Sequence, residues 1–205
     1  MTATELAARH GQYAPDYDTA TRDYGCYAAE VLFGLLFEYV QPGQHLLDLG
    51  IGTGLSAAPF VKAGLVVSGA DFSPEMLAVC RAKHLAVDLR VCDLTQTPWP
   101  YPPQAFDHVV ACGLLHFFEA LDPFLASAAR VLRPGGCLAF TIKAAPAGGP
   151  PVVGAAAQGL SVYRHSPGYV TELAARQGLV VLKAVRFYIG DDLFEAWVTR
   201  AAPAR

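Results

Sequence analysis

The sequence predicts one α/β domain in which seven strands form a mostly parallel sheet with helices on both faces. Short apolar runs alternate with stretches of helical periodicity along the chain, which is the pattern of a parallel sheet covered on both sides. The chain has 205 residues and 53% of them are hydrophobic. A domain of this length and composition can bury a sizeable core without a disulfide or a structural metal.

The predicted elements begin with a helix and end with a hairpin. Apolar side chains recur at helical spacing from about residue 19 to residue 40, and the helix should end at Pro42-Gly43. Five strands are then expected near residues 45–49, 65–70, 87–91, 106–112 and 136–142, separated by helical stretches. The runs 179–188 and 193–199 flank Gly190-Asp191-Asp192, which is typical of a β-hairpin and adds two more strands.

The most informative segment is the glycine-stepped turn Gly50-Ile51-Gly52-Thr53-Gly54, which follows the first expected strand. Gly50, Gly52 and Gly54 lie where a strand bends into a helix while its backbone stays close to a ligand, and glycine allows both without steric cost. Leu55 occupies the place of the last glycine in a dinucleotide-type Gly-x-Gly-x-x-Gly pattern. The turn therefore predicts a nucleotide-type pocket without a phosphate cradle.

Two acidic residues restrict the kind of ligand that the predicted pocket is expected to bind. Asp71 ends the second expected strand, where a carboxylate can accept hydrogen bonds from both hydroxyls of a ribose, as NAD or S-adenosylmethionine would require. Asp93 closes the third expected strand and is positioned for an adenine amino group. A pocket with carboxylates and no phosphate cradle favours a cationic adenosine ligand. Both carboxylates could instead cap the elements that follow.

In these segments, and over nearly its whole length, the chain resembles the class I S-adenosylmethionine-dependent methyltransferases of small-molecule type. Five segments resemble the family's motifs in the correct order, namely 46–54 (acidic-Gly-x-Gly-x-Gly), 69–77 (ribose), 92–94 (adenine), 106–112 (fourth strand) and 132–138 (turn before the fifth strand). The resemblance implies a Rossmann-like sheet in which the C-terminal hairpin inserts one antiparallel strand. It also implies transfer of a methyl group to a small-molecule acceptor by in-line displacement.

The resemblance also assigns cofactor-binding residues. They are Tyr13, Tyr17, Asp48, Gly50, Gly52, Gly54, Asp71, Phe72, Met76, Asp93, Leu94 and Cys112. Asp48 would hold the ammonium group of S-adenosylmethionine through water, or it could simply anchor the turn. Phe72 and Met76 would form an apolar wall for the adenine, or they could pack beneath the ribose loop. Cys112 would lie near the methionine half of the ligand, although a small buried thiol needs no function.

Aromatic and histidine side chains supply the remaining candidates. Tyr13 and Tyr17 belong to a segment that resembles the part of small-molecule methyltransferases that folds over the cofactor, and the alternative is that they anchor the N-terminus. His116 follows the fourth strand and is the candidate catalytic residue, because a hydroxyl acceptor would benefit from a general base. A structural role for this histidine is the alternative. Tyr163 and His165 are candidate substrate contacts.

The chain is predicted to form one methyltransferase domain over 1–205. Within it, we expect an N-terminal helical cap over 1–43 and a substrate lid over 144–165. The lid prediction rests on the segment 144–161, which is mostly alanine, glycine and proline and follows the fifth strand at the edge where ligands bind. A flexible surface connector is the alternative for the same residues.

Composition excludes several function classes. Five cysteines without a CxxC pair indicate reduced thiols and a cytoplasmic location, and none resembles a metal ligand. With a net charge of −3 and no basic stripe, a nucleic-acid partner is disfavoured. No apolar run is long enough to predict a membrane segment, and the sequence does not reveal the oligomeric state.

Two further function classes stay open. The chain could be a non-catalytic methyltransferase-like module that binds S-adenosylmethionine or a protein partner. It could also be an oxidoreductase with an adenosine-containing cofactor, since Gly-x-Gly turns occur in both classes.

Overall fold

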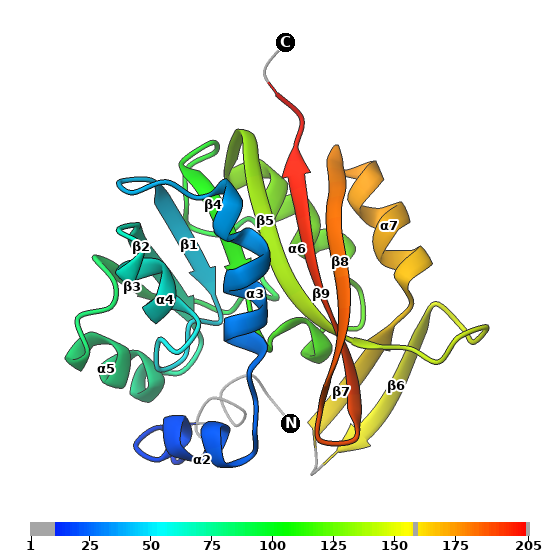
Figure 1. The fold of residues 1–205 in the computed structure, drawn as a ribbon, viewed down its shortest axis with the longest axis horizontal. Helices are drawn as coiled ribbons and strands as arrows, with labels where there is room; N and C mark the ends of the chain where they lie inside the picture. Colours follow the sequence, from blue (N-terminus) through cyan, green and yellow to red (C-terminus); the bar gives the residue numbers. More distant parts are fainter. Residues whose placement is uncertain (1–10, 158–159, 204–205) are drawn as a thin grey trace.

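The computed structural model describes residues 11–157 and 160–203. Within them, nine strands form one sheet with helices on both faces (Figure 1). The central strands are parallel in the order β3 (Asp88–Val91), β2 (Val66–Asp71), β1 (His45–Leu49), β4 (Phe106–Ala111) and β5 (Leu132–Ala144). The predicted α/β class with a mostly parallel sheet is confirmed.

The C-terminal hairpin also forms as predicted. β8 (Leu179–Ile189) pairs with β9 (Asp192–Ala201), and β9 pairs antiparallel with β5. Because β5 begins at Leu132, it includes the turn that the sequence placed before it, and its pairing with β4 shifts register there. Gly136 in this shift cannot be replaced without movement, since a Cβ would lie 2.5 Å from the carbonyl oxygen of Asp107.

The prediction of seven strands is wrong, because the sheet has nine strands within the described residues. β6 (Val152–Ala157) and β7 (Leu160–His165) form a hairpin in which β7 pairs parallel with the last residues of β5 (Figure 1). The low side-chain volume of this segment led to the prediction of a loop. Strand pairing needs only the backbone, however, and the buried side chains of Val162 and His165 anchor the hairpin.

Helices cover both faces and one edge of the sheet. Their bounds are α2 (Tyr17–Asp23), α3 (Ala28–Leu36), α4 (Ala57–Lys62), α5 (Pro74–Ala82), α6 (Asp122–Val131) and α7 (Pro167–Arg176), with 3₁₀ turns η1 (Phe37–Tyr39) and η2 (Leu115–Phe117). The single helix predicted over 19–40 is therefore wrong. It divides at Gly25, whose φ of +71° is incompatible with a continuous helix.

Two hydrophobic cores hold the sheet between its helices. One packs α6 and α7 against the sheet around Phe124, Phe140 and Trp197, and the other packs α3, α4 and α5 around Leu36 and Phe60. Successive strand residues alternate between the two cores, as the side-chain period of a strand requires.

The carboxyl ends of β1, β2, β4 and β5 lie at one edge of the sheet, beside α2 (Figure 1). In open α/β sheets this edge is where ligands bind. Within the described ranges, no helix combines the length and the apolar composition needed to cross a bilayer.

Candidate functional site

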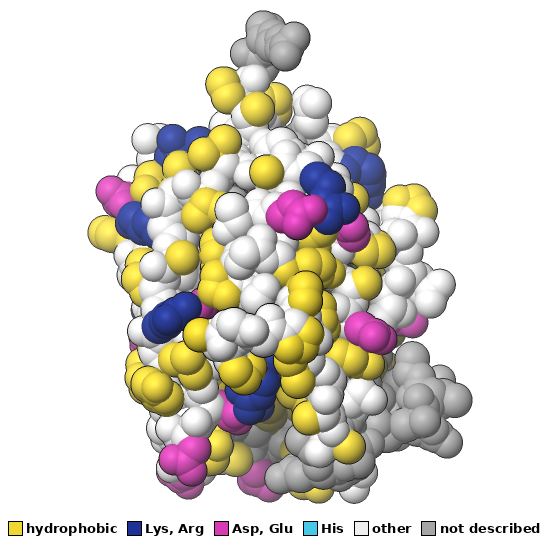
Figure 2. Space-filling view, turned by 90° about the vertical axis from the view of Figure 1, so that its right-hand side faces the viewer, with side chains coloured by type: hydrophobic (Ala, Val, Ile, Leu, Met, Phe, Trp, Pro, Cys, Tyr) yellow, Lys and Arg dark blue, Asp and Glu magenta, His cyan; other side chains and the backbone are white. Residues whose placement is uncertain are grey.

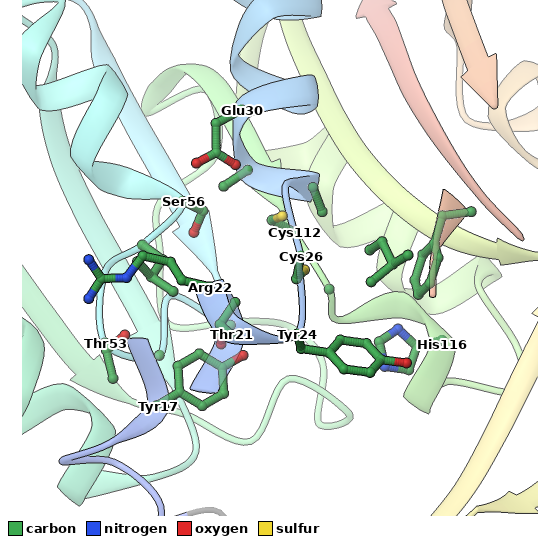
Figure 3. A pocket seen from close by; sticks show the side chains of 18 of the residues that line it. Tyr17, Thr21, Arg22, Tyr24, Cys26, Glu30, Thr53, Ser56, Cys112 and His116 are labelled. Atoms are coloured by element: carbon green, nitrogen blue, oxygen red, sulfur yellow. The ribbon is translucent and has the colours of Figure 1, made fainter. Parts of the chain in front are cut away.

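A cavity of about 370 Å³ lies at the carboxyl edge of the sheet. The glycine turn, α2, the link from α2 to α3, the end of β4, η2, the end of β5 and the β8–β9 turn all contribute to its wall. Figure 3 shows Tyr17, Arg22, Thr53 and Ser56 on one side, Tyr24 and His116 on the other, and Cys26 and Cys112 between them. Its volume is in the range of small-molecule sites.

The three glycines of the turn have different roles. All three have positive φ, namely +72° at Gly50, +53° at Gly52 and +90° at Gly54. A Cβ at Gly52 would enter open space 4.0 Å from Asp71 Oδ2, so this glycine leaves room in the cavity wall. A Cβ at Gly54 would lie 2.7 Å from Leu85, so Gly54 instead permits close packing against the neighbouring segment.

Asp48 is completely buried on β1, behind Ser56, which lines the cavity. Its Oδ2 accepts a hydrogen bond of 2.6 Å from Ser56 Oγ, whereas its Oδ1 has no partner among the described residues. Burial raises the pKa of this carboxyl group to about 7. A buried carboxylate with an unsatisfied oxygen is costly, and a cationic ligand group would relieve that cost. The site therefore fits the ammonium group that the sequence predicted there.

Asp48 should make the unliganded fold sensitive to pH. Because its pKa is 3.8 in the unfolded chain and about 7 in the folded one, folding binds a proton between these values, and stability is lost as the pH rises through this window. We expect Asp48→Asn to raise the unfolding temperature at pH 8, with a gain in unfolding free energy of about 1 to 3 kcal/mol. Thermal denaturation at pH 4 and pH 8 would measure this gain, and an equal effect at both pH values would contradict the assignment.

Asp71 joins the glycine turn to the start of α5. Its Oδ2 accepts from Gly52 N at 2.9 Å and its Oδ1 accepts from Ser73 N at 2.9 Å. The helix cap is the hydroxyl group of Ser73, which accepts from Met76 N, so Asp71 is not the cap that the alternative interpretation suggested. Asp93 accepts from the backbone and hydroxyl groups of Thr95 at 3.0 and 2.7 Å.

The other predicted cofactor residues lie in different environments. Phe72 is half-buried and Met76 is buried, both close in sequence to Asp71. Leu94 is part of the core packed against α6. Tyr17 and Cys112 line the cavity, and burial raises the pKa of each side chain. Tyr13 is 61% exposed and is not among the cavity-lining residues.

The sequence did not reveal how α2 is held over the glycine turn. Asp18 accepts a 2.5 Å hydrogen bond from Thr53 Oγ1 and forms an ion pair with Lys83. Lys83 also donates to the carbonyl oxygen of Thr53 at 2.9 Å. Asp18 directly follows Tyr17, but no sequence pattern connects it with Lys83 at the end of α5.

The three residues predicted to act on the methyl acceptor differ in their position relative to the cavity. His116 on η2 lines the cavity, with its ring centroid 4.2 Å from that of Phe117 and 6.1 Å from that of Phe194. His165 is completely buried, stacks on Tyr169 and lies 3.2 Å from the carbonyl oxygen of Glu119. Tyr163 lies on β7 opposite Gly154. Neither His165 nor Tyr163 lines the cavity, so this conformation does not support their proposed substrate contacts.

Several cavity residues could not be found from the sequence. They are Tyr24 in the link between α2 and α3, Ile189 and Asp192 at the β8–β9 turn, Phe194 on β9 and Lys143 on β5. Only the fold brings these segments together. The structure contains no cluster of three or more His, Cys, Asp or Glu side chains suited to a metal ion within the residues that it describes.

Comparison with known proteins agrees with the geometry. A family model described as "Methyltransferase domain" matches residues 47–140, which contain the glycine turn, Asp71 and Asp93. Over these residues the chain is similar to the methyltransferase domain family. It is 34% identical over 149 residues to the demethylmenaquinone methyltransferase of Renibacterium salmoninarum, covering 71% of this chain and 62% of that protein. It is also 33% identical to the malonyl-[acyl-carrier protein] O-methyltransferase of Serratia marcescens, covering 68% and 53%.

The solved structures show the same fold. The 1,6-didemethyltoxoflavin-N1-methyltransferase of Burkholderia thailandensis superposes with a TM-score of 0.75 at 18% identity, covering 98% of this chain and 91% of that chain. Its structure contains bound 1,6-didemethyltoxoflavin and S-adenosylhomocysteine. The chain spans 38 to 62% of the length of the curated relatives it matches.

Proposed function

We propose that this protein is a methyltransferase that transfers the methyl group of S-adenosylmethionine to a small-molecule acceptor. The observation that carries the proposal is the buried carboxylate of Asp48, which has an unsatisfied oxygen beside a glycine turn with space at Gly52. When bound, S-adenosylmethionine supplies a methyl group that its sulfonium centre has already activated. The task left to the protein is alignment and exclusion of water.

We assign the cofactor contacts to four groups of residues. Asp48 would hold the ammonium group through water, Asp71 would accept from the ribose hydroxyl groups, and Asp93 would accept from the adenine amino group. Phe72, Met76 and Leu94 would supply apolar surface to the adenine. Tyr17 and Cys112 would border the methionine half, with Tyr13 at its outer end.

On the acceptor side we assign His116 as the candidate catalytic residue. Its position in the cavity wall supports this role. For a hydroxyl acceptor, a ring nitrogen of His116 would receive the proton as the methyl group is transferred. An amine acceptor presented with a free lone pair would not require this step.

The class of acceptor and the location are also proposals. The relatives named above act on demethylmenaquinone and on malonyl-[acyl-carrier protein], as their names state. Figure 2 shows Lys and Arg side chains dispersed among hydrophobic and uncharged ones on the face it draws, which supports a small molecule over a nucleic acid. All five cysteines are free, which supports a cytoplasmic location.

Methyl-labelled S-adenosylmethionine incubated with the protein and a cell extract would test the function. We expect label in the small-molecule fraction and stoichiometric S-adenosylhomocysteine. Cofactor binding without any transferred label would favour the non-catalytic module, and label in RNA, DNA or protein would refute the small-molecule assignment.

We also propose that α2 and the segment 144–165 close over the bound ligands. The supporting contacts are those of Asp18 with the glycine turn and of Arg164 on β7 with Asp192 in the cavity wall. Added S-adenosylhomocysteine should slow amide hydrogen exchange near residues 13–17 and in 144–165, because opening would then require ligand release. Protection limited to the glycine turn and β2 would contradict closure by the cofactor.

A further inference from the structure

The half of the cavity opposite the glycine turn has a mainly apolar and aromatic wall. Phe117, Ile189 and Phe194 line it together with His116. Tyr24 crosses from the link between α2 and α3 to the β8–β9 turn, where its hydroxyl group would lie 2.9 Å from a Cβ built on Gly190. Figure 3 shows the Tyr24 ring beside His116. This half therefore suits a ligand with a hydrophobic body.

A charged cluster interrupts this apolar wall. Lys143 Nζ donates to Asp192 Oδ2 at 2.7 Å, and Arg164 pairs with the other oxygen of the same carboxylate. Two cations thus share one anion, so the cluster keeps one unit of positive charge. Hydrogen bonds from Lys143 and then Arg164 hold the pKa of Asp192 below its usual value, which keeps the carboxylate ionised.

The positive charge of Lys143 lies in the cavity wall, where a ligand can reach it. Lys143 and Asp192 both line the cavity, whereas Arg164 approaches from β7. The Lys143 side chain is only 16% exposed and its Nζ lies 5.5 Å from the centroid of the Phe194 ring. Lys143 is partly desolvated and shares its counterion Asp192 with Arg164. Such a cation gains more interaction free energy from an anionic ligand than a solvated cation does.

Two other charged side chains, Arg22 and Glu30, also contribute to the wall, from α2 and α3. Their charges cancel, and both residues are exposed. They therefore do not cancel the positive charge of the cluster formed by Lys143, Arg164 and Asp192.

We infer that the methyl acceptor is an apolar or aromatic acid whose anionic group is held by Lys143 while its hydrophobic body contacts Phe194, Ile189 and Tyr24. This inference rests on the proposed function, because it assigns this half of the cavity to the acceptor. It distinguishes an acidic acceptor from a neutral or basic one of the same shape.

Calorimetry with three ligands of one skeleton would test the inference. The protein is first saturated with S-adenosylhomocysteine and then titrated with 3-phenylpropionate, 3-phenylpropanol or 3-phenylpropylamine. We expect the acid to bind at least about 10-fold more tightly than the alcohol, and the amine most weakly. Equal affinities, tighter binding of the amine or no binding of the acid would overturn the inference.

Two lysine variants give a matched comparison. Lys143→Met should lower the affinity for the acid to that for the alcohol. Lys183→Met should keep the preference, because Lys183 donates to the Leu35 carbonyl oxygen and pairs with Glu38, outside the cavity wall. Retained acid preference in a folded Lys143→Met protein would overturn the role of Lys143. The wild-type titrations decide the acid preference even if this variant does not fold.

The first titration separates the two proposals. Failure to bind S-adenosylhomocysteine would count against the proposed function itself, whereas normal cofactor binding without acid preference would count only against the acidic acceptor.

Discussion

Gly52→Val should reduce the affinity for S-adenosylhomocysteine by at least about 100-fold, which corresponds to ~2.7 kcal/mol. Gly52 lies where a Cβ would enter open space in the cavity wall, 4.0 Å from Asp71 Oδ2. A valine there would occupy the volume that the ligand needs and would crowd the carboxylate that Gly52 N holds at 2.9 Å. Isothermal titration calorimetry would measure the loss directly.

The control must reproduce the backbone strain, because φ at Gly52 is +53° and valine at positive φ costs on the order of 1 to 3 kcal/mol. Gly178 lies between α7 and β8 with φ of +68°, and a Cβ added to it would have no other atom within 4 Å. Gly178→Val should therefore lose similar stability but bind S-adenosylhomocysteine normally. A folded Gly52→Val protein with unchanged affinity would show that the ligand lies elsewhere.

Asp71→Asn should weaken S-adenosylhomocysteine binding by about 1 to 3 kcal/mol, or roughly 5- to 150-fold. The aspartate accepts from both Gly52 N and Ser73 N at 2.9 Å. Asparagine has only one acceptor oxygen, so its amide NH₂ would face one of these two N–H groups. The variant would thus lose a ribose acceptor and also loosen the glycine turn.

Calorimetry on Asp71→Asn should be paired with Asp88→Asn. Asp88 begins β3 and pairs with Arg90 at 2.7 Å, on a partly exposed surface outside the cavity wall. Its substitution should leave the affinity unchanged. If both variants bind S-adenosylhomocysteine like the wild type, the ribose assignment of Asp71 is incorrect.

The sequence predicted the features that local pattern determines. The strands that end at Leu49 and Asp71 are short apolar runs, and the turn between Gly50 and Gly54 needs residues that tolerate positive φ, which leaves a direct trace in the sequence. Of these segments the glycine turn lies in the cavity wall, so this part of the wall could be located from the sequence.

The acceptor half was not predictable, because long-range pairing determines it. Lys143, Arg164 and Asp192 meet only because β5 pairs with both β7 and β9. The β6–β7 hairpin has few large side chains, so its strands leave little periodic signal, and His165 is buried by this pairing instead of facing the cavity. The docking of α2 through Asp18 and Lys83 likewise joins residues 65 positions apart.

The central claim is that the cavity beside Asp48 is built for a cationic adenosine cofactor. Calorimetric titration of the unmodified protein with S-adenosylhomocysteine and, separately, with NAD tests this claim most directly. The structure predicts one S-adenosylhomocysteine bound per chain and no measurable heat with NAD, because Leu55 follows the glycine turn where a phosphate-binding pattern has its last glycine. Saturable NAD binding without S-adenosylhomocysteine binding would contradict it.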